Sequence, residues 1–159
     1  MTDFALPRLA IPAQLLLTEG PERRGEIYVM ERVPQHAGHE TPLDMLNRPE
    51  GFFPFRPAGE RVGGGVLLVA KARTIRLSAP RQATDEDPAR LSAAKMAGIA
   101  LTLADGSELS GWATLELPTH HSRLLDYLNA STDPFFAVTT AEQVHFVNRA
   151  HVLFARPED

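Results

Sequence analysis

Four histidines in the carboxyl-terminal part of the chain could do chemistry together: His120, His121, His145 and His151. Imidazole is a common ligand of divalent metals, and three such groups can hold an ion. The spacing matches neither H-x-x-x-H nor H-E-x-x-H, the patterns that place two ligands on one helix face. We keep His120, His121 and His151 as weak metal candidates, and we expect no metal and no other cofactor.

Ser122, His121 and Asp126 supply the residue types of a hydrolytic triad. They lie near one expected helix start, where the Ser122 hydroxyl suits an N-cap that accepts a backbone N–H bond. The sequence has no G-x-S-x-G nucleophile elbow. The stretch RVGGGVLL lacks the Lys-Ser/Thr pair of a phosphate-binding loop and precedes an expected strand. We therefore expect no catalytic residues and no enzyme.

The composition bounds the class of protein. The chain has 159 residues, is 43% hydrophobic, carries a formal charge of −4 and has no cysteine. A mildly acidic chain is poorly suited to neutralising phosphates, so nucleic acid is not the partner we expect. Disulfides and thiolate ligands are excluded. We expect no signal peptide, no membrane insertion and a cytoplasmic location, because no apolar run approaches the roughly 20 residues of a membrane span.

One pattern of residues occurs twice, in the same order of blocks. LLLTEGPERRGEIYV matches LTLADGSELSGWATL, LDMLN with a later Phe-Phe matches LDYLN with a later Phe-Phe, and VLLVAKARTIRL matches VHFVNRAHVLFA. The matched positions include Gly25 with Gly111, Asn47 with Asn129 and Val66 with Val144. Ordered blocks of this kind predict a tandem repeat.

Each copy predicts short strands joined by tight turns, with one short helix between the second and third strands. Asp105-Gly106 is a hairpin turn signal, because both residue types tolerate positive φ. Thr41 and Pro42 suit the start of the first helix, and Asn47 and Asn129 suit helix C-caps. We expect the later strands around 52–55, 66–70, 74–77, 135–138, 144–147 and 151–154.

The predicted fold is mainly β. It consists of two tandem small antiparallel β-barrel units, each with one short helix, related by a pseudo-twofold axis. We place an N-terminal arm at 1–13, the first unit at 14–77, a linker at 78–98 and the second unit at 99–159. The linker is polar and Ala-rich, and residues 88–96 could form a helical turn or two.

The stretch LTLADGSELSGWATLEL resembles the opening of Sm-like and SH3-like small β-barrels, and VNRAHVLFA is similar to the turn before their last strand. Here Ala150 stands where a Gly is usual, the helix lies between strands two and three, and the Asp-x-Asn element that contacts RNA has no counterpart. The repeated unit also resembles uncharacterised small bacterial domains with a Leu-Asn…Phe-Phe…Val-Asn-Lys/Arg-x-His pattern. The resemblance implies a fold more than an activity.

Outward-facing side chains on the second strand of each unit are the candidate partner-binding residues: Trp112, Thr114, Tyr28 and Met30. Aromatic and Met side chains are enriched at interfaces. Two interpretations stay open, since these residues could bind a partner or pack one repeat against the other. We expect a non-catalytic adaptor or scaffold that binds protein and could form homo-oligomers. The alternatives are an RNA-binding Sm-like protein and a sensor of metal or small ligands.

Overall fold

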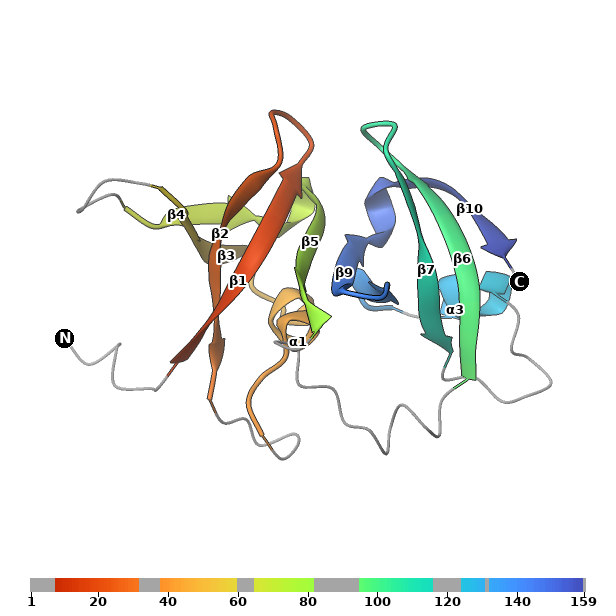
Figure 1. The fold of residues 1–159 in the computed structure, drawn as a ribbon, viewed down its shortest axis with the longest axis horizontal. Helices are drawn as coiled ribbons and strands as arrows, with labels where there is room; N and C mark the ends of the chain where they lie inside the picture. The colour runs from red at the N-terminus through yellow and green to blue at the C-terminus, as the bar shows by residue number, and fades with distance from the viewer. Residues whose placement is uncertain are drawn as a thin grey trace.

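The computed structural model describes residues 8–31, 38–59, 65–81, 95–115, 124–130 and 132–158. Within these residues, ten strands form one antiparallel sheet, with two α-helices and two 3-10 turns (Figure 1). The expectation of a mainly β, antiparallel fold is confirmed. The first half contains β1 (Arg8–Leu17), β2 (Arg23–Met30), α1 (Pro42–Asn47), β3 (Phe52–Pro57), β4 (Leu67–Ala70), η1 (Lys71–Arg73) and β5 (Thr74–Pro80). The second half contains β6 (Lys95–Leu103), β7 (Glu108–Leu115), α3 (Leu124–Ala130), β8 (Phe135–Thr139), β9 (Gln143–Asn148), η4 (Arg149–His151) and β10 (Val152–Glu158).

Two hairpins begin the two halves. β1 pairs with β2, and β6 pairs with β7. Gly20 and Gly106 in their turns have φ of +87° and +88°, a conformation that glycine adopts without steric cost. The expected alternation is also present, because Ile27 and Val29 of β2 and Ala113 of β7 are buried.

Helix α1 begins as the sequence predicts. Thr41 is the N-cap, its hydroxyl accepts a bond from the Asp44 N–H at 3.1 Å, and Asp44 accepts one from the Thr41 N–H at 3.1 Å. This reciprocal capping box satisfies two N–H groups of the first turn. The C-cap is Arg48 rather than Asn47, which is the last helical residue. The expected cap Ser122 of the second helix lies outside the described residues.

The strand order of the sheet is β10-β6-β7-β8-β9-β5-β1-β2-β3-β4. The expectation of closed barrels is wrong, because β4 does not return to pair with β5. Instead β5 pairs with β9 of the other half, which leaves β4 and β10 as free edges of one open sheet. The expected pseudo-twofold relation is not shown either. A twofold axis would join like strands, such as β5 with β10, whereas β5 and β9 hold different positions in their halves.

Several expected boundaries shift. β1 begins at Arg8, so residues 8–13 belong to the sheet and not to an arm. β5 continues to Pro80 and β6 begins at Lys95, so both ends of the expected linker at 78–98 belong to strands. Residues 95 and 96, which we expected to end a helical turn, are therefore extended. His151 lies in the 3-10 turn η4 rather than in a strand.

Two apolar cores lie on opposite faces of the joined strands, and each draws residues from both halves. The first core is built mainly from the first half but includes Phe135, Val144 and Phe146 of β8 and β9. The second is built mainly from the second half but includes Leu16 and Ile75 of β1 and β5. Strands β8, β9 and β5 are therefore buried on both faces, which makes the middle of the sheet its most buried part.

Candidate interaction surface

The β6–β7 hairpin presents one candidate surface for a partner. Trp112 of β7 is 52% exposed and belongs to neither core. Thr114 lies on the same face of β7, opposite Met96 of β6, and its hydroxyl lies 3.6 Å from the Met96 sulfur. Met96 is also exposed. Trp112, Thr114 and Met96 thus form an apolar surface patch, and the exposure of Trp112 argues against the alternative that it packs between the two halves.

Tyr28 and Met30 lie elsewhere. They belong to β2, which is separated from β7 in the sheet by β8, β9, β5 and β1. The Tyr28 hydroxyl accepts a 2.8 Å bond from Arg56 Nε, and this contact raises the pKa of Arg56. The Met30 N–H donates to Glu40 Oε1 at 3.1 Å. The structure therefore does not bring the four predicted partner-binding residues together: Trp112 and Thr114 share one surface, and Tyr28 and Met30 lie on another.

The candidate metal ligands do not form a site among the residues that the structure describes. His120 and His121 lie outside those residues. His151 Nε2 lies 2.7 Å from the Ala72 carbonyl oxygen, so it links η4 to η1 across the two halves. No group of three potential His, Asp or Glu ligands occurs in the described part of the chain.

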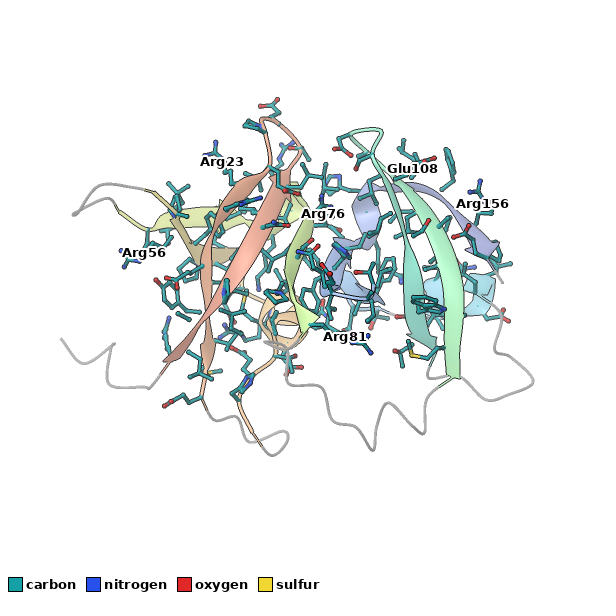
Figure 2. The ribbon with its side chains drawn as sticks, in the orientation of Figure 1. Arg23, Arg56, Arg76, Arg81, Glu108 and Arg156 are labelled. Atoms are coloured by element: carbon teal, nitrogen blue, oxygen red, sulfur yellow. The ribbon has the colours of Figure 1, made fainter. Side chains whose placement is uncertain are left out.

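A buried Ser–His contact crosses the joint between the halves, which sequence reasoning missed. Ser78 of β5 and His145 of β9 are register partners, and Ser78 Oγ lies 2.6 Å from His145 Nδ1. Arg76, which lies between the halves in Figure 2, donates to Ser78 Oγ at 2.9 Å and to Glu22 Oε2 at 2.7 Å. Burial lowers the pKa of His145 to about 4, and the positive charge of Arg76 contributes in the same direction.

The Ser78–His145 contact has the residue types of a nucleophile and its base, but its setting favours a structural role. Ser78 is fully buried, so its hydroxyl is out of reach of a substrate. Arg76 donates to the Ser78 oxygen, so the hydroxyl proton can be donated to the neutral imidazole and both polar groups are satisfied. No pattern in the sequence links Ser78 to His145, because the two residues meet only through the tertiary pairing of β5 with β9.

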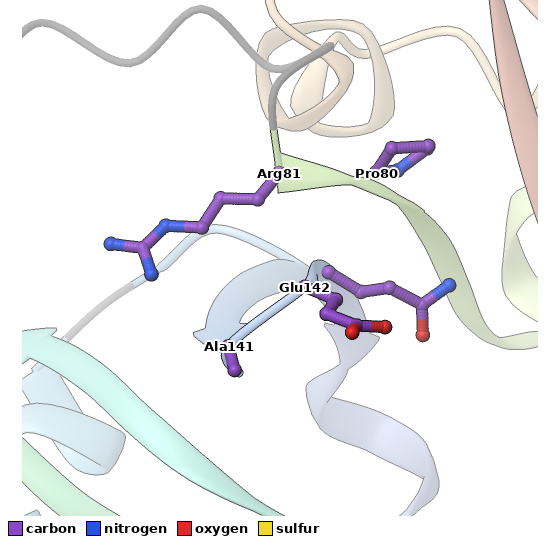
Figure 3. Close-up of a pocket in the computed structure, with 5 residues that line it drawn as sticks. Pro80, Arg81, Ala141 and Glu142 are labelled. Carbon is purple, nitrogen blue, oxygen red and sulfur yellow. The ribbon is translucent and has the colours of Figure 1, made fainter.

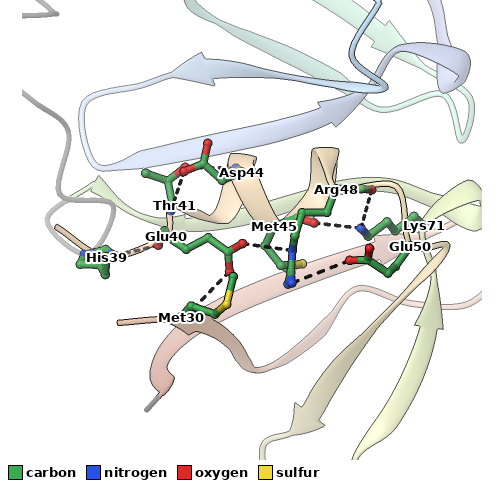
Figure 4. Close-up of polar contacts among 9 residues, drawn as sticks. All are labelled: Met30, His39, Glu40, Thr41, Asp44, Met45, Arg48, Glu50 and Lys71. Atoms are coloured by element: carbon green, nitrogen blue, oxygen red, sulfur yellow. Dashed lines mark hydrogen bonds and ion pairs between the residues drawn. The ribbon is translucent and has the colours of Figure 1, made fainter. Parts of the chain in front are cut away.

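A second polar cluster, around α1, is also structural (Figure 4). Glu40 is buried and forms an ion pair with Arg48 Nε at 3.0 Å. Lys71 donates from Nζ to the carbonyl oxygens of Met45 and Arg48, at 2.8 and 3.1 Å. The ammonium group thus satisfies carbonyls at the carboxyl end of α1. Burial lowers the pKa of Lys71, and the Arg48 charge lowers it further.

An open hollow of about 640 Å³ lies where β5 ends beside the β8–β9 turn (Figure 3). It is lined by Pro80, Arg81, Ala141, Glu142 and Gln143. The Arg81 N–H donates to the Glu142 carbonyl oxygen at 2.8 Å, so part of the polar lining is used in holding the strand ends together. The hollow is open and three of its five lining residues are polar or charged, unlike the enclosed and mostly apolar lining of a typical small-molecule site.

Apolar side chains are concentrated at the two free edges of the sheet. Among the described residues, nine large hydrophobic side chains are exposed, and six of them lie at the edges. Leu67 and Leu68 belong to β4, Val66 directly precedes it, and Phe52 of β3 pairs with Ala70 of β4; Leu153 and Phe154 belong to β10. Sequence reasoning assigned these residues to strands and did not recognise them as surface.

Comparison of the chain with protein-family models, curated proteins and solved structures gives no match. None of the helices within the described residues has the length and apolar character of a membrane span.

Proposed function

We propose that the protein is a non-catalytic protein–protein interaction module, an adaptor or scaffold subunit built from two copies of one small β unit. The strand order supports the duplication, because β5-β1-β2-β3-β4 in the first half corresponds to β10-β6-β7-β8-β9 in the second. Each half also carries a short helix between its second and third strands and a 3-10 turn before its last strand.

Two glycines support the resemblance to strongly bent Sm-like or SH3-like units. Gly25 of β2 and Gly111 of β7 are matched in the sequence pattern. A Cβ at Gly25 would clash with the Arg56 carbonyl oxygen, and one at Gly111 would lie 2.6 Å from the Thr139 carbonyl oxygen. In both halves the second strand thus crosses the third so closely that only glycine fits.

The exposed Trp112 is the observation that carries the proposed binding role. A Trp side chain has a large apolar area, and leaving half of it in water costs free energy that a partner would recover. Met96 beside it adds an adaptable apolar side chain, and Thr114 adds a polar group at the margin. Such a patch, with an aromatic residue at its centre, is typical of an energetic hot spot in a protein interface.

Replacement of Trp112 tests this proposal. We expect Trp112→Ser to abolish the capture of protein partners by the tagged protein from cells of its source, as measured by quantitative mass spectrometry. Leu125→Ser is the matched control, because Leu125 is also an exposed apolar residue, at 68%, but belongs to α3 rather than to the β6–β7 hairpin. Circular dichroism should show both variants folded. Capture of the same proteins by the wild type and Trp112→Ser would refute the proposed surface.

A further inference from the structure

The joint between β5 and β9 is an interface built into the chain. The two strands pair from Arg76 with Val147 to Pro80 with Gln143. Asn47 of α1 secures the neighbouring strand β8, because its side chain accepts from the Phe135 N–H at 2.9 Å and donates to the Phe135 carbonyl oxygen at 3.2 Å. Phe135, Val144 and Phe146 then complete the core of the first half.

The two free edges of the sheet are the counterparts of the two strands in this joint. By strand order, β4 holds in the first half the place that β9 holds in the second, and β10 holds the place of β5. β5 and β10 even share an irregularity. Ile75 and Leu153 are each the extra residue of a bulge, against β1 and β6 respectively, but Ile75 is buried and Leu153 is exposed.

The exposed residues at the β4 edge match residues that the joint buries. Phe52 is 62% exposed, whereas its counterpart Phe135 is 2% exposed. Leu68 is 74% exposed, whereas its counterpart Phe146 is 3% exposed. Val66 follows the same pattern, since it is exposed and matches the fully buried Val144. These side chains have the character of a contact surface that no part of the described chain covers.

The polar part of the joint has a counterpart as well. Asn129 of α3 matches Asn47 of α1, and it is exposed. In the joint, Asn47 bonds the backbone of Phe135. The corresponding partner for Asn129 is the backbone of Phe52, which lies beside the β4 edge at the other end of the molecule.

We propose that copies of this chain associate head to tail, the β4 edge of one copy pairing with the β10 edge of the next in the register of the β5–β9 joint. Transfer of that register places Val69 opposite Phe154, Leu68 opposite Ala155 and Leu67 opposite Arg156. In this arrangement, the second core of the neighbouring copy is extended by Phe52, Val66 and Leu68. Their counterparts in the second half, Phe135, Val144 and Phe146, complete the first core in the same way within one chain.

The exposed edge itself favours this occupant. Monomeric proteins usually protect free strands with charge, proline or irregularity; the four-residue strand β4, LLVA, carries none of these, whereas β10 carries Arg156, Pro157 and Glu158 towards its end. The edge that β4 would pair with, β10, lies at the opposite end of the molecule (Figure 1). Opposite ends cannot meet within one chain, so the contact is heterologous and each added copy presents a new free edge.

Two edge variants test the proposal because each blocks one edge and leaves the other intact. Leu68→Lys blocks β4, and Phe154→Lys blocks β10. Both side chains are exposed, so the fold should be retained, as thermal unfolding would verify. By light scattering after size-exclusion chromatography, we expect the wild type to form a multimer and each variant to be a monomer. Trp112→Ser, away from both edges, should associate as the wild type does.

Mixing the two variants gives the sharpest result. Leu68→Lys keeps its β10 edge and Phe154→Lys keeps its β4 edge, so an equimolar mixture should form a one-to-one heterodimer and no larger species. An interface between like edges would not be restored by mixing. A wild type that is monomeric from micromolar to submillimolar concentration, single variants that still associate, or a mixture that remains monomeric would each overturn the proposal.

Cross-linking tests the register. The chain has no cysteine, so Leu68→Cys/Ala155→Cys introduces the only thiols. Opposed residues on an antiparallel pair bring their Cβ atoms within disulfide range. We expect oxidation to give disulfide-linked multimers of the double variant, whereas Leu68→Cys/Arg156→Cys, displaced by one residue to the other face, should link poorly. Equal linking of the two pairs would contradict the register.

Discussion

Ser78 and His145 satisfy each other's hydrogen-bonding groups where the two halves of the sheet join. Their side chains face each other where β5 meets β9, and burial keeps the imidazole neutral by lowering its pKa to about 4. The unfolded chain has no such burial, so its histidine titrates near 6.5. Between these values the unfolded state binds more protons than the folded state, and stability must therefore fall as the pH falls.

This linkage predicts that the protein loses about 1–2 kcal/mol of stability from His145 alone between pH 7 and pH 5. Urea unfolding at several pH values would measure it. His145→Gln removes the titrating group, so the free energy of unfolding of this variant should depend less on pH over the same range. Parallel pH profiles for the wild type and the variant would rule out His145 as the source.

Asn47 illustrates a residue whose place is predictable and whose role is not. Its position at the end of a short apolar helix predicts a C-cap. In the structure the cap is Arg48, and the Asn47 amide is used for a two-point bond to the backbone of β8. The residue lies 88 positions from Phe135 in the chain, and only the tertiary structure brings them together.

At the scale of elements, the second strand of each half is constrained by its glycine. The hairpins and their alternation of buried and exposed residues follow from local pattern, and the sequence predicts both. The glycine contacts depend on a neighbouring strand: at Gly25 the backbone of β3 occupies the space where a Cβ would stand. Backbone atoms cannot swing away as a flexible side chain can, so the close approach is an obligate feature of the bend.

We expect Gly25→Ala to destabilise the protein by about 2–4 kcal/mol, because the β2–β3 pairing must shift to relieve the clash. Gly51→Ala is the control, since no atom lies within 4 Å of the position that its Cβ would take and its φ is not positive. It should change stability by no more than about 0.5 kcal/mol. Denaturant unfolding would compare them, and equal stability of the two variants would contradict the role given to Gly25.

At the scale of the whole molecule, the two halves are not independent. They share the β5–β9 pairing, and each core includes residues of the other half. Two closed barrels would each keep a separate core and could unfold separately. An open sheet with shared cores is expected to unfold as a unit, because loss of either half exposes apolar residues of the other.

Phe146→Ala should reveal this coupling. Phe146 belongs to β9 but packs in the core of the first half, so its truncation should cost about 3–5 kcal/mol. Hydrogen exchange followed by mass spectrometry should then show faster exchange in β1 and β2 as well as in β8 and β9. Faster exchange confined to residues 95–158 would indicate that the halves are stable separately.

The sequence by itself determined the local structure: the antiparallel strands, the Asp105-Gly106 turn and the Thr41 cap of α1. These follow from periodicity, turn chemistry and capping, which act over a few residues. The repeated pattern remains a prediction that the matching strand order supports. The tertiary structure decided how the strands join, because pairing of β5 with β9 depends on contacts between distant segments. It also decided which apolar residues are surface: Phe52 and Phe135 are alike in sequence context, but Phe135 packs in the core of the other half whereas Phe52 belongs to neither core.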